Sequence, residues 1–365
     1  MRFAGAGLRE GARVILAITL KDCIDAVRDR MLLSILAAVL LMVLFFRLSP
    51  ALRQEDTRVL AVVDPGQSSV LDQWTDSGEF ELKRFSSRQE MEHFLGGEDT
   101  AVLGLILPAD LEQHVEGEGA LELDGYVDHW VSDSDAGEIG SFFESELTAL
   151  TGRSVQIDVD NEVPFTHPRS FKPVTTSFLM VYALVVTGLM IAPNLMIEEK
   201  ELRTLDALLI SPASSGQIVI AKALTGLFYC LAAAGLVLAA SASLVVHWDV
   251  AILAAVCGSL FTVSVGLLLG VALNSRQQLI IWSAVLMVPM FIPVIASEIL
   301  PDIQAPTLLQ QVVSLVPTVP VAEATRWALS GKFPWTEILS GLAVTVVFAI
   351  VFLAAVAWIV RRSDR

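Results

Sequence analysis

The residue types that usually perform catalysis or bind metal ions are sparse in this chain, and their spacing fits no familiar chemistry. Its 5 histidines are scattered without the spacing of metal ligands, so no zinc site is predicted. No G-x-x-x-x-G-K-S/T phosphate loop occurs, so the chain is not expected to hold ATP itself. The motifs H-E-x-x-H and G-x-S-x-G are also absent, which argues against a membrane hydrolase. We therefore predict that the chain is not an enzyme and has no metal site or cofactor of its own.

Polar side chains inside long apolar stretches are the other candidates for chemistry, because such groups can bind ions within a membrane. One stretch contains Thr175, Thr176, Ser177, Tyr182, Thr187 and Asn194, and another contains Ser259, Thr262 and Ser264. Ion-coupled transporters normally also use buried carboxylates or bases to carry the driving proton or cation. Those residue types are almost absent from the apolar stretches. The sequence therefore predicts that any transport is powered from outside the membrane.

The segment from Glu198 to Lys222 has the pattern of a helix that contacts something other than solvent. It begins with a run of charged residues, which a solvated loop would explain. The leucines that follow fall on one face of a helix, namely Leu202, Leu205, Leu208 and Leu209. Ser211-Pro212 is predicted to end that helix, and Ser214 or Ser215 to begin the next one. A loop exposed only to solvent would not need the leucine stripe.

The elements that must position these residues are apolar stretches of membrane-spanning length. The chain has 365 residues, of which 54% are hydrophobic and only 18% are charged, a balance that favours a membrane protein. Six stretches are long enough to cross a hydrocarbon core of about 30 Å. They are residues 31–46, 173–197, 223–246, 250–273, 279–296 and 338–360. The predicted fold is therefore an α-helical membrane protein with six transmembrane helices.

An acidic region, residues 50–172, is inserted between the first two predicted spans. It contains 26 Asp and Glu residues against 8 Lys and Arg, so it accounts for the net charge of −16 of the whole chain. Strands are predicted at 58–63, 101–107 and 155–159, and helices after the capping box Ser87 to Glu90 and at 134–150. This alternation predicts an α/β domain. Its negative charge keeps the domain soluble and repels nucleic acid, so no nucleic-acid partner is expected.

The distribution of basic residues predicts the orientation of the chain. Outside the acidic region, 13 of 16 Lys and Arg residues lie in segments that a single topology places in the cytoplasm. Both termini are then cytoplasmic, and the α/β domain is extracytoplasmic. Residues 1–30 precede the first span, 31–49, and carry Leu16, Leu20 and Ile24 at helical spacing. They predict an amphipathic helix that lies on the inner membrane surface or packs on another protein.

Three further patterns concern the membrane region, residues 173–365. Small residues recur along the fourth span, at Ala254, Gly258, Thr262, Gly266 and Gly270. They favour close packing against another helix of the same chain over a seam between two copies. Pro289 and Pro293 predict a kink or a break in the fifth span. Residues 304–335 are predicted to form short helices that dip into the outer leaflet, with Trp327 and Trp335 at the headgroup level.

The segment after the second span resembles the corresponding segment of type-2 ABC exporter permeases. The matching residues are Glu199-Lys200-Glu201, Thr204-Leu205-Asp206, Ser211-Pro212 and Lys222, although Glu is more usual than Asp206. Compatible similarity extends to residues 21–30, 105–111 and 317–335. The resemblance therefore covers nearly the whole chain. It is to the branch of the family that has an external α/β domain between the first two spans.

The resemblance implies a permease that dimerises, with itself or with a similar permease, and binds one ABC ATPase subunit per permease. ATP and Mg²⁺ would belong to that ATPase. The implied coupling helix is at 198–216, with Glu198, Glu199, Glu201, Arg203, Thr204, Leu205, Leu208, Ser211 and Pro212 as coupling residues. The implied translocation path is lined by the second and fifth spans, with Phe178, Tyr182, Met287 and Phe291 in its wall. The expected location is the prokaryotic inner membrane, in contact with lipid.

The predicted function is export of an amphipathic or lipid-like substrate or drug, and two alternatives remain open. One is a sodium exporter of the same family, because carbonyl and hydroxyl oxygens can bind sodium without carboxylates. The other is a non-transporting membrane receptor or scaffold whose acidic domain senses a ligand. Six spans are more than signalling requires. A neighbouring gene that encodes an ATPase would favour transport.

Overall fold

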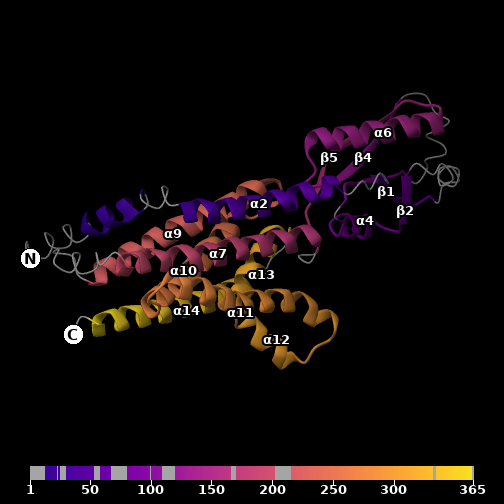
Figure 1. Ribbon diagram of the computed structural model, residues 1–365. Coiled ribbons are helices and arrows are strands. Elements are labelled where there is room, and N and C mark those ends of the chain that lie inside the picture. Colours follow the sequence, from indigo (N-terminus) through magenta and orange to yellow (C-terminus); the bar gives the residue numbers. More distant parts are fainter. Residues whose placement is uncertain are drawn as a thin grey trace, which may run out of the picture.

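The computed structural model describes residues 13–22, 24, 30–52, 58–66, 80–98, 100–108, 120–165, 170–201, 215–331 and 334–363. The molecule is mostly helical, with a small sheet at one end of a long bundle of helices (Figure 1). The helical segment 13–22 and the C-terminal end of the last helix lie at the other end of the bundle (Figure 1).

The sheet has five strands in the order β2-β1-β3-β4-β5. They are β1 (Arg58–Val63), β2 (Phe80–Phe85), β3 (Val102–Ile106), β4 (Leu121–Asp128) and β5 (Val155–Val163). β1 pairs in parallel with β2 and β3, and β4 pairs in parallel with β5, whereas β3 and β4 are antiparallel. The predicted strands at β1, β3 and β5 are confirmed, and β5 extends further than predicted. Nothing in the sequence analysis had assigned β2 or β4.

Two helices cover opposite faces of this sheet, because successive side chains of a strand point to opposite sides. Helix α6 (Asp133–Thr151) packs Phe143 and Leu147 against one face of β1 and β3. Helix α4 (Arg88–Leu95) packs Met91 and Leu95 against the other face. The mixed sheet with helices on both faces confirms the predicted α/β pattern.

The predicted capping box begins α4. The Ser87 hydroxyl oxygen accepts a hydrogen bond from the backbone N–H of Glu90 at 3.3 Å. The Glu90 carboxylate accepts one from the backbone N–H of Ser86 at 3.1 Å, one residue earlier than in the usual reciprocal pair. Both bonds satisfy backbone donors near the start of the helix, which otherwise have no partner within it.

Six helices form the bundle. They are α2 (Arg30–Leu52), α7 (Phe171–Glu201), α9 (Ser215–Ala240), α10 (Trp248–Ala272), α11 (Arg276–Asp302) and α14 (Trp335–Ser363). Among the described residues, all but α2 contain a segment long and apolar enough to cross a membrane. Helix α2 coincides with the first predicted span, but its apolar part, Leu33–Phe46, is shorter. The sixth crossing therefore stays a prediction.

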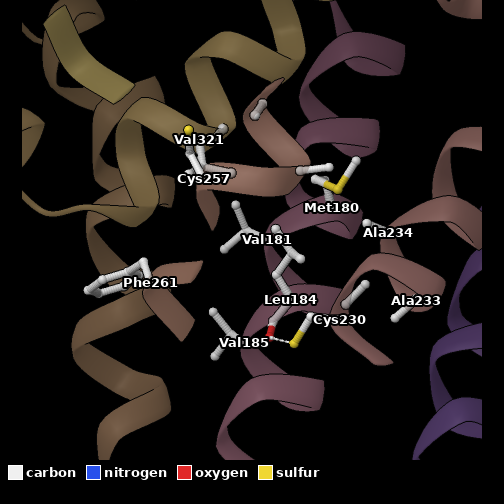
Figure 2. Packing of buried hydrophobic residues seen from close by; sticks show 14 of the residues in the cluster. Met180, Val181, Leu184, Val185, Cys230, Ala233, Ala234, Cys257, Phe261 and Val321 are labelled. Atoms are coloured by element: carbon white, nitrogen blue, oxygen red, sulfur yellow. Dashed lines mark hydrogen bonds between the residues drawn. The ribbon is translucent and has the colours of Figure 1, made fainter. Parts of the chain in front are cut away.

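Helices α7 and α10 form the centre of the bundle. The apolar window of α7 is 72% buried and that of α10 is 67% buried, against 17% for α14. Figure 2 shows the α7 residues Met180 and Leu184 close to Cys230 and Ala234 of α9, in the same cluster as Cys257 of α10. The most buried helix is thus α7, which the sequence analysis linked to both coupling and the translocation path.

The small residues of the fourth predicted span explain how closely α7 and α10 approach. A Cβ atom at Gly266 would meet the backbone carbonyl oxygen of Gly188 on α7. One at Gly258 would lie 2.7 Å from the Leu184 side chain, and one at Gly188 would lie 2.6 Å from Thr262. The predicted packing against a helix of the same chain is confirmed.

Between α11 and α14 the chain forms two short helices, α12 (Thr307–Ser314) and α13 (Thr318–Ala328). Pro317 precedes α13, and Pro334 precedes α14, as their fixed backbone angles allow at a helix start. The predicted short helices are confirmed, whereas their insertion into the outer leaflet stays a prediction. Helix α11 continues through Pro289 and Pro293, so the span is not broken there, and the predicted kink stays a prediction.

The sheet contacts the bundle through the turn after β4 and the chain after β5. The His129 Nε2 atom lies 3.1 Å from the carbonyl oxygen of Leu244, so it carries the proton of that hydrogen bond. Burial lowers the pKa of His129, and the ring is neutral at neutral pH. Phe165 forms an isolated β-bridge with Ser330 and accepts a hydrogen bond from the backbone N–H of Gly331. These contacts join the α/β unit to the loops next to α10 and α13.

Candidate functional site

The predicted coupling helix lies only partly within the described residues. Helix α7 ends at Glu201, so the acidic start of the helix, Glu198, Glu199 and Glu201, continues the α7 backbone. Helix α9 begins at Ser215. The other predicted coupling residues lie outside the described residues, namely Arg203, Thr204, Leu205, Leu208, Ser211 and Pro212. Their role therefore stays a prediction. The ends of α7 and α9 that bracket them lie away from the sheet (Figure 1).

The structure brings the predicted wall residues of the second and fifth spans together. The ring centroid of Phe291 on α11 lies 5.6 Å from that of Phe178 and 6.1 Å from that of Tyr182, both on α7. Met287 precedes Phe291 by one helical turn and is half-buried beside the main core. Because residues four apart share a helix face, Met287 lies on the same face of α11 as Phe291. We call these four residues the aromatic cluster.

Two hydroxyl groups that the sequence analysis did not single out hold α11 beside its neighbours. The buried Ser283 hydroxyl donates to the carbonyl oxygen of Leu189 on α7 at 3.0 Å. The buried Thr318 hydroxyl of α13 donates to the carbonyl oxygen of Met290 at 2.8 Å. Along α11, Ser283 lies one helical turn before Met287, and Met290 directly precedes Phe291, so both bonds are close to the aromatic cluster. Interhelical bonds of this kind are common in membrane bundles, but a lone Ser or Thr in a sequence does not reveal its partner.

An ion pair ties the start of α9 to the N-terminal helical segment. The Lys222 Nζ atom lies 2.8 Å from an Asp22 carboxylate oxygen, and the two side chains are only 2% and 7% exposed. The Thr19 hydroxyl lies 3.3 Å from the carbonyl oxygen of Ala221 in the same contact. Leu16 and Leu20 are exposed on the N-terminal segment, so its apolar residues point away from α9. The predicted amphipathic segment therefore has one face fixed to the bundle and another open to a membrane or a partner.

Replacing Lys222 with Met is expected to destabilise the protein, because it leaves a buried carboxylate without its cation. Breaking one partner of a buried pair costs about 3 kcal/mol or more, whereas replacing both partners by apolar residues is often neutral. Lys222→Met should therefore lower the thermal unfolding midpoint of the purified protein, and the double variant Lys222→Met with Asp22→Leu should recover most of the loss. Equal midpoints for the single variant and the unchanged protein would contradict this role of the pair.

A second ion pair lies at the sheet end of the bundle. Arg326 of α13 contacts the carboxylate of Glu298 near the end of α11, and its side chain is 7% exposed. Arg326 is one of the three Lys and Arg residues outside the acidic region that the predicted topology does not place in the cytoplasm. A buried charge needs a partner, but its partner 28 residues away cannot be read from the sequence.

The hydroxyl groups of Ser259, Thr262 and Ser264 on α10 donate their protons within that helix. The Ser259, Thr262 and Ser264 hydroxyls donate to the carbonyl oxygens of Ala255, Gly258 and Phe261, respectively. In the part of the chain that the structure describes, no three or more His, Cys, Asp or Glu side chains gather as a metal site would require. The hydroxyls of α10 therefore take part in the packing of that helix.

Comparison with known families gives a match that covers residues 30–358. The matching family is described as ABC-2 family transporter protein. The match includes α2, the α/β unit, the apolar helices α7, α9, α10 and α11, and most of α14. No curated protein matches the chain.

Proposed function

The chain belongs to the ABC-2 family of transporter proteins, and from that premise we propose that it exports an amphipathic or lipid-like substrate or drug from the cytoplasm. Membership makes the chain a multi-pass membrane protein and the permease subunit of an ABC transporter. It also implies association with an ABC ATPase subunit, which carries out the hydrolysis. The proposal concerns which substrate crosses the membrane, in which direction it moves, and how ATP hydrolysis in the ATPase subunit is coupled to that movement.

One observation carries the proposal, namely that α7 is a single helix of 31 residues, Phe171–Glu201. It bears Phe178 and Tyr182 of the aromatic cluster near one end and the acidic start of the coupling helix at the other. At 1.5 Å per residue, Tyr182 and Glu201 are about 28 Å apart along the helix axis. A continuous helix of this length, which runs through Pro193, supports transmission of a movement from the ATPase to the translocation path.

The aromatic cluster supports an amphipathic substrate. Phe178, Phe291 and Met287 offer apolar and polarisable surface, and the Tyr182 hydroxyl adds one polar group. Pockets for organic ligands typically combine an apolar lining with a few polar groups. A sodium ion needs several converging oxygens instead, whereas the Tyr182 hydroxyl is the one side-chain oxygen among the four residues of the aromatic cluster. The observations therefore favour the amphipathic substrate over sodium.

The proposal includes an arrangement in the membrane. Both termini and the coupling helix are cytoplasmic, and the α/β unit is extracytoplasmic, as the distribution of basic residues predicts. Two such permeases, identical or similar, pair with two ATPase subunits in a prokaryotic inner membrane. Membership in a transporter family leaves the receptor alternative without support.

Replacing Phe291 with Ala is expected to reduce transport without releasing the ATPase subunit. The substitution removes both ring contacts of the cluster, each of which is typically about 0.5–1.5 kcal/mol, so a roughly tenfold loss of transport is expected. Phe228→Ala is a matched control, because Phe228 is an exposed aromatic residue of α9 outside the cluster. Both variants are reconstituted with the ATPase in lipid vesicles, and uptake of fluorescent amphiphiles is measured. Equal transport by the two variants would overturn the assignment of the wall.

A further inference from the structure

The start of α7, at the end of the bundle beside the sheet, is held on the α/β unit by two contacts (Figure 1). The Lys172 ammonium group, in the first turn of α7, lies over the ring of Trp130, which belongs to the turn after β4. The hydroxyl of Ser170, which is only 8% exposed, donates to the carbonyl oxygen of Gly97 after α4 at 3.4 Å. One end of α7 is therefore attached to two separate parts of the α/β unit.

The start of α10 is held by the neighbouring residue of the same turn. The His129 Nε2 atom donates to the carbonyl oxygen of Leu244 at 3.1 Å, four residues before α10 begins at Trp248. Because His129 and Trp130 are adjacent, a single turn contacts the sheet-side ends of both α7 and α10. We call the two contacts, of Trp130 with Lys172 and of His129 with Leu244, the sheet-end clamp.

The turn that carries the sheet-end clamp is itself fixed within the α/β unit. The backbone N–H of Val131 donates to the carbonyl oxygen of Asp128 at 2.9 Å, and that of His129 donates to Val163 of β5 at 3.0 Å. The His129 ring also meets the ring of Phe165 edge to face, with 5.1 Å between the ring centroids. A turn held by these contacts can resist a force that is applied through α7 or α10.

Helices α7 and α10 are packed too closely to slide far past each other. A Cβ atom at Gly266 of α10 would meet the carbonyl oxygen of Gly188 on α7, so the clamp acts on two helices in backbone contact. Along α7, Lys172 lies 10 residues before Tyr182 and 29 before Glu201. The corresponding axial distances are about 15 Å and about 44 Å. A tilt about the clamp would therefore move Tyr182 about one third as far as Glu201.

We propose that the sheet-end clamp is the pivot about which α7 and α10 tilt when the ATPase displaces the coupling helix, and that Trp130 is a positioning residue for transport. This inference rests on the proposed export function, because it explains how a displacement of the coupling helix reaches the aromatic cluster. With the clamp intact, a displacement at Glu201 becomes a tilt of the two helices. Without it, the same displacement moves α7 along its own axis, and ATP is hydrolysed with little transport.

The first test measures the transport of a fluorescent amphiphile per ATP hydrolysed by the complete complex in lipid vesicles. Trp130→Ala removes the ring beneath Lys172, and a partly desolvated cation–π contact changes an equilibrium by roughly tenfold. Transport per ATP should therefore fall about tenfold while hydrolysis continues. Trp130→Phe keeps a ring, so its transport per ATP should stay within about threefold of the unchanged protein.

The matched control for these variants is Trp335→Ala. Trp335 is an exposed tryptophan that begins α14 at the same end of the bundle, and it lies outside the sheet-end clamp. Its replacement should leave transport per ATP unchanged. A purely structural effect of losing a tryptophan would lower hydrolysis and transport together, whereas loss of the pivot lowers transport alone.

The second test measures distances between two spin labels and needs no substrate. One label is at Ser145→Cys on α6, and the other is at Thr175→Cys near the clamp or at Lys200→Cys near the far end of α7, in a chain without its native cysteines. Complexes without nucleotide and trapped with vanadate are compared. Thr175 and Lys200 lie about 5 Å and about 42 Å from Lys172 along α7, so the Thr175 label should move about one tenth as far. In Trp130→Ala the two labels should move by similar distances.

Equal movement of the two α7 labels in the unchanged complex, or no movement of either, would overturn the pivot. A Trp130→Ala variant that transports as much per ATP as Trp335→Ala would also overturn it. Failure of the unchanged complex to accumulate the amphiphile with ATP is a different result. It would contradict the export function, and the label distances would then decide the pivot alone.

Discussion

Replacing Leu205 and Leu208 together by Asp is expected to release the ABC ATPase subunit and abolish ATP-driven transport. Both leucines belong to the predicted apolar stripe of the coupling helix, between the end of α7 at Glu201 and the start of α9 at Ser215. Buried apolar anchors dominate the energy of protein interfaces, and each is worth about 2 kcal/mol or more. Losing two of them should weaken ATPase binding by roughly a thousandfold.

The measurement is the amount of ATPase subunit that stays with the permease on a size-exclusion column, together with transport by the complex in vesicles. Two conservative controls accompany it. Leu205→Met with Leu208→Met keeps the apolar surface and should retain the ATPase. Lys200→Ala should have a mild effect, because charges at the rim of an interface mainly set orientation and association rate. A double Asp variant that keeps its ATPase and transports normally would show that the stripe is not the docking surface.

Replacing Gly266 with Leu is expected to prevent the membrane bundle from packing. Extra carbon atoms in a tight core typically cost about 1–3 kcal/mol even where neighbouring side chains can move. Here the first added atom meets the carbonyl oxygen of Gly188, and a backbone atom cannot change its rotamer. Since α7 and α10 are the two most buried spans, their separation would disturb the whole bundle.

The control for this variant is Gly235→Leu in α9, because nothing lies within 4 Å of a Cβ atom at that position. Both substitutions add the same side chain to a helix interior, so any difference reports the contact between α7 and α10. The yield of monodisperse protein and its thermal unfolding midpoint are measured for both. Gly266→Leu should fall well below Gly235→Leu in both quantities. Similar values would mean that the close approach of α7 and α10 does not support the fold.

Most helices of the fold were predictable because their signals are local. The apolar stretches that became α7, α9, α10, α11 and α14 each exceed the thickness of a membrane, and no tertiary information is needed to find them. Helix α4 was equally clear, because Ser87 and Glu90 form a cap within four residues. Strands β1 and β3 are continuous apolar runs, as expected for strands covered on both faces.

Strands β2 and β4 escaped prediction because their sequences carry little apolar signal of their own. Strand β2 reads Phe-Glu-Leu-Lys-Arg-Phe and lies at an edge of the sheet, where charged residues are tolerated. Strand β4 alternates leucines with acids and contains Gly125, which lies at an irregularity in the pairing with β5. Both are strands because a neighbour pairs with them, and a single sequence does not show that neighbour.

The candidate site, like the fold, has parts that could be predicted from the sequence and parts that could not. Phe178, Tyr182, Met287 and Phe291 were predicted as wall residues from the family resemblance. The structure places the rings of Phe178, Tyr182 and Phe291 close together, and the role of all four residues in transport stays a prediction. The pair of Asp22 and Lys222 was missed, because 200 residues separate the partners. A lysine at the start of an apolar span was the available signal, since a charge in that position needs a counterion.

The most direct test of the proposed function is ATP-driven transport by the complete complex. The permease is co-purified with its ABC ATPase and reconstituted in inside-out vesicles, and accumulation of a fluorescent amphiphile in the lumen is followed with and without ATP. We predict accumulation that needs ATP and disappears with an ATPase variant unable to hydrolyse it. Accumulation without ATP, or ATP-driven loss of the amphiphile from preloaded vesicles, would contradict the assignment as an ATP-driven exporter.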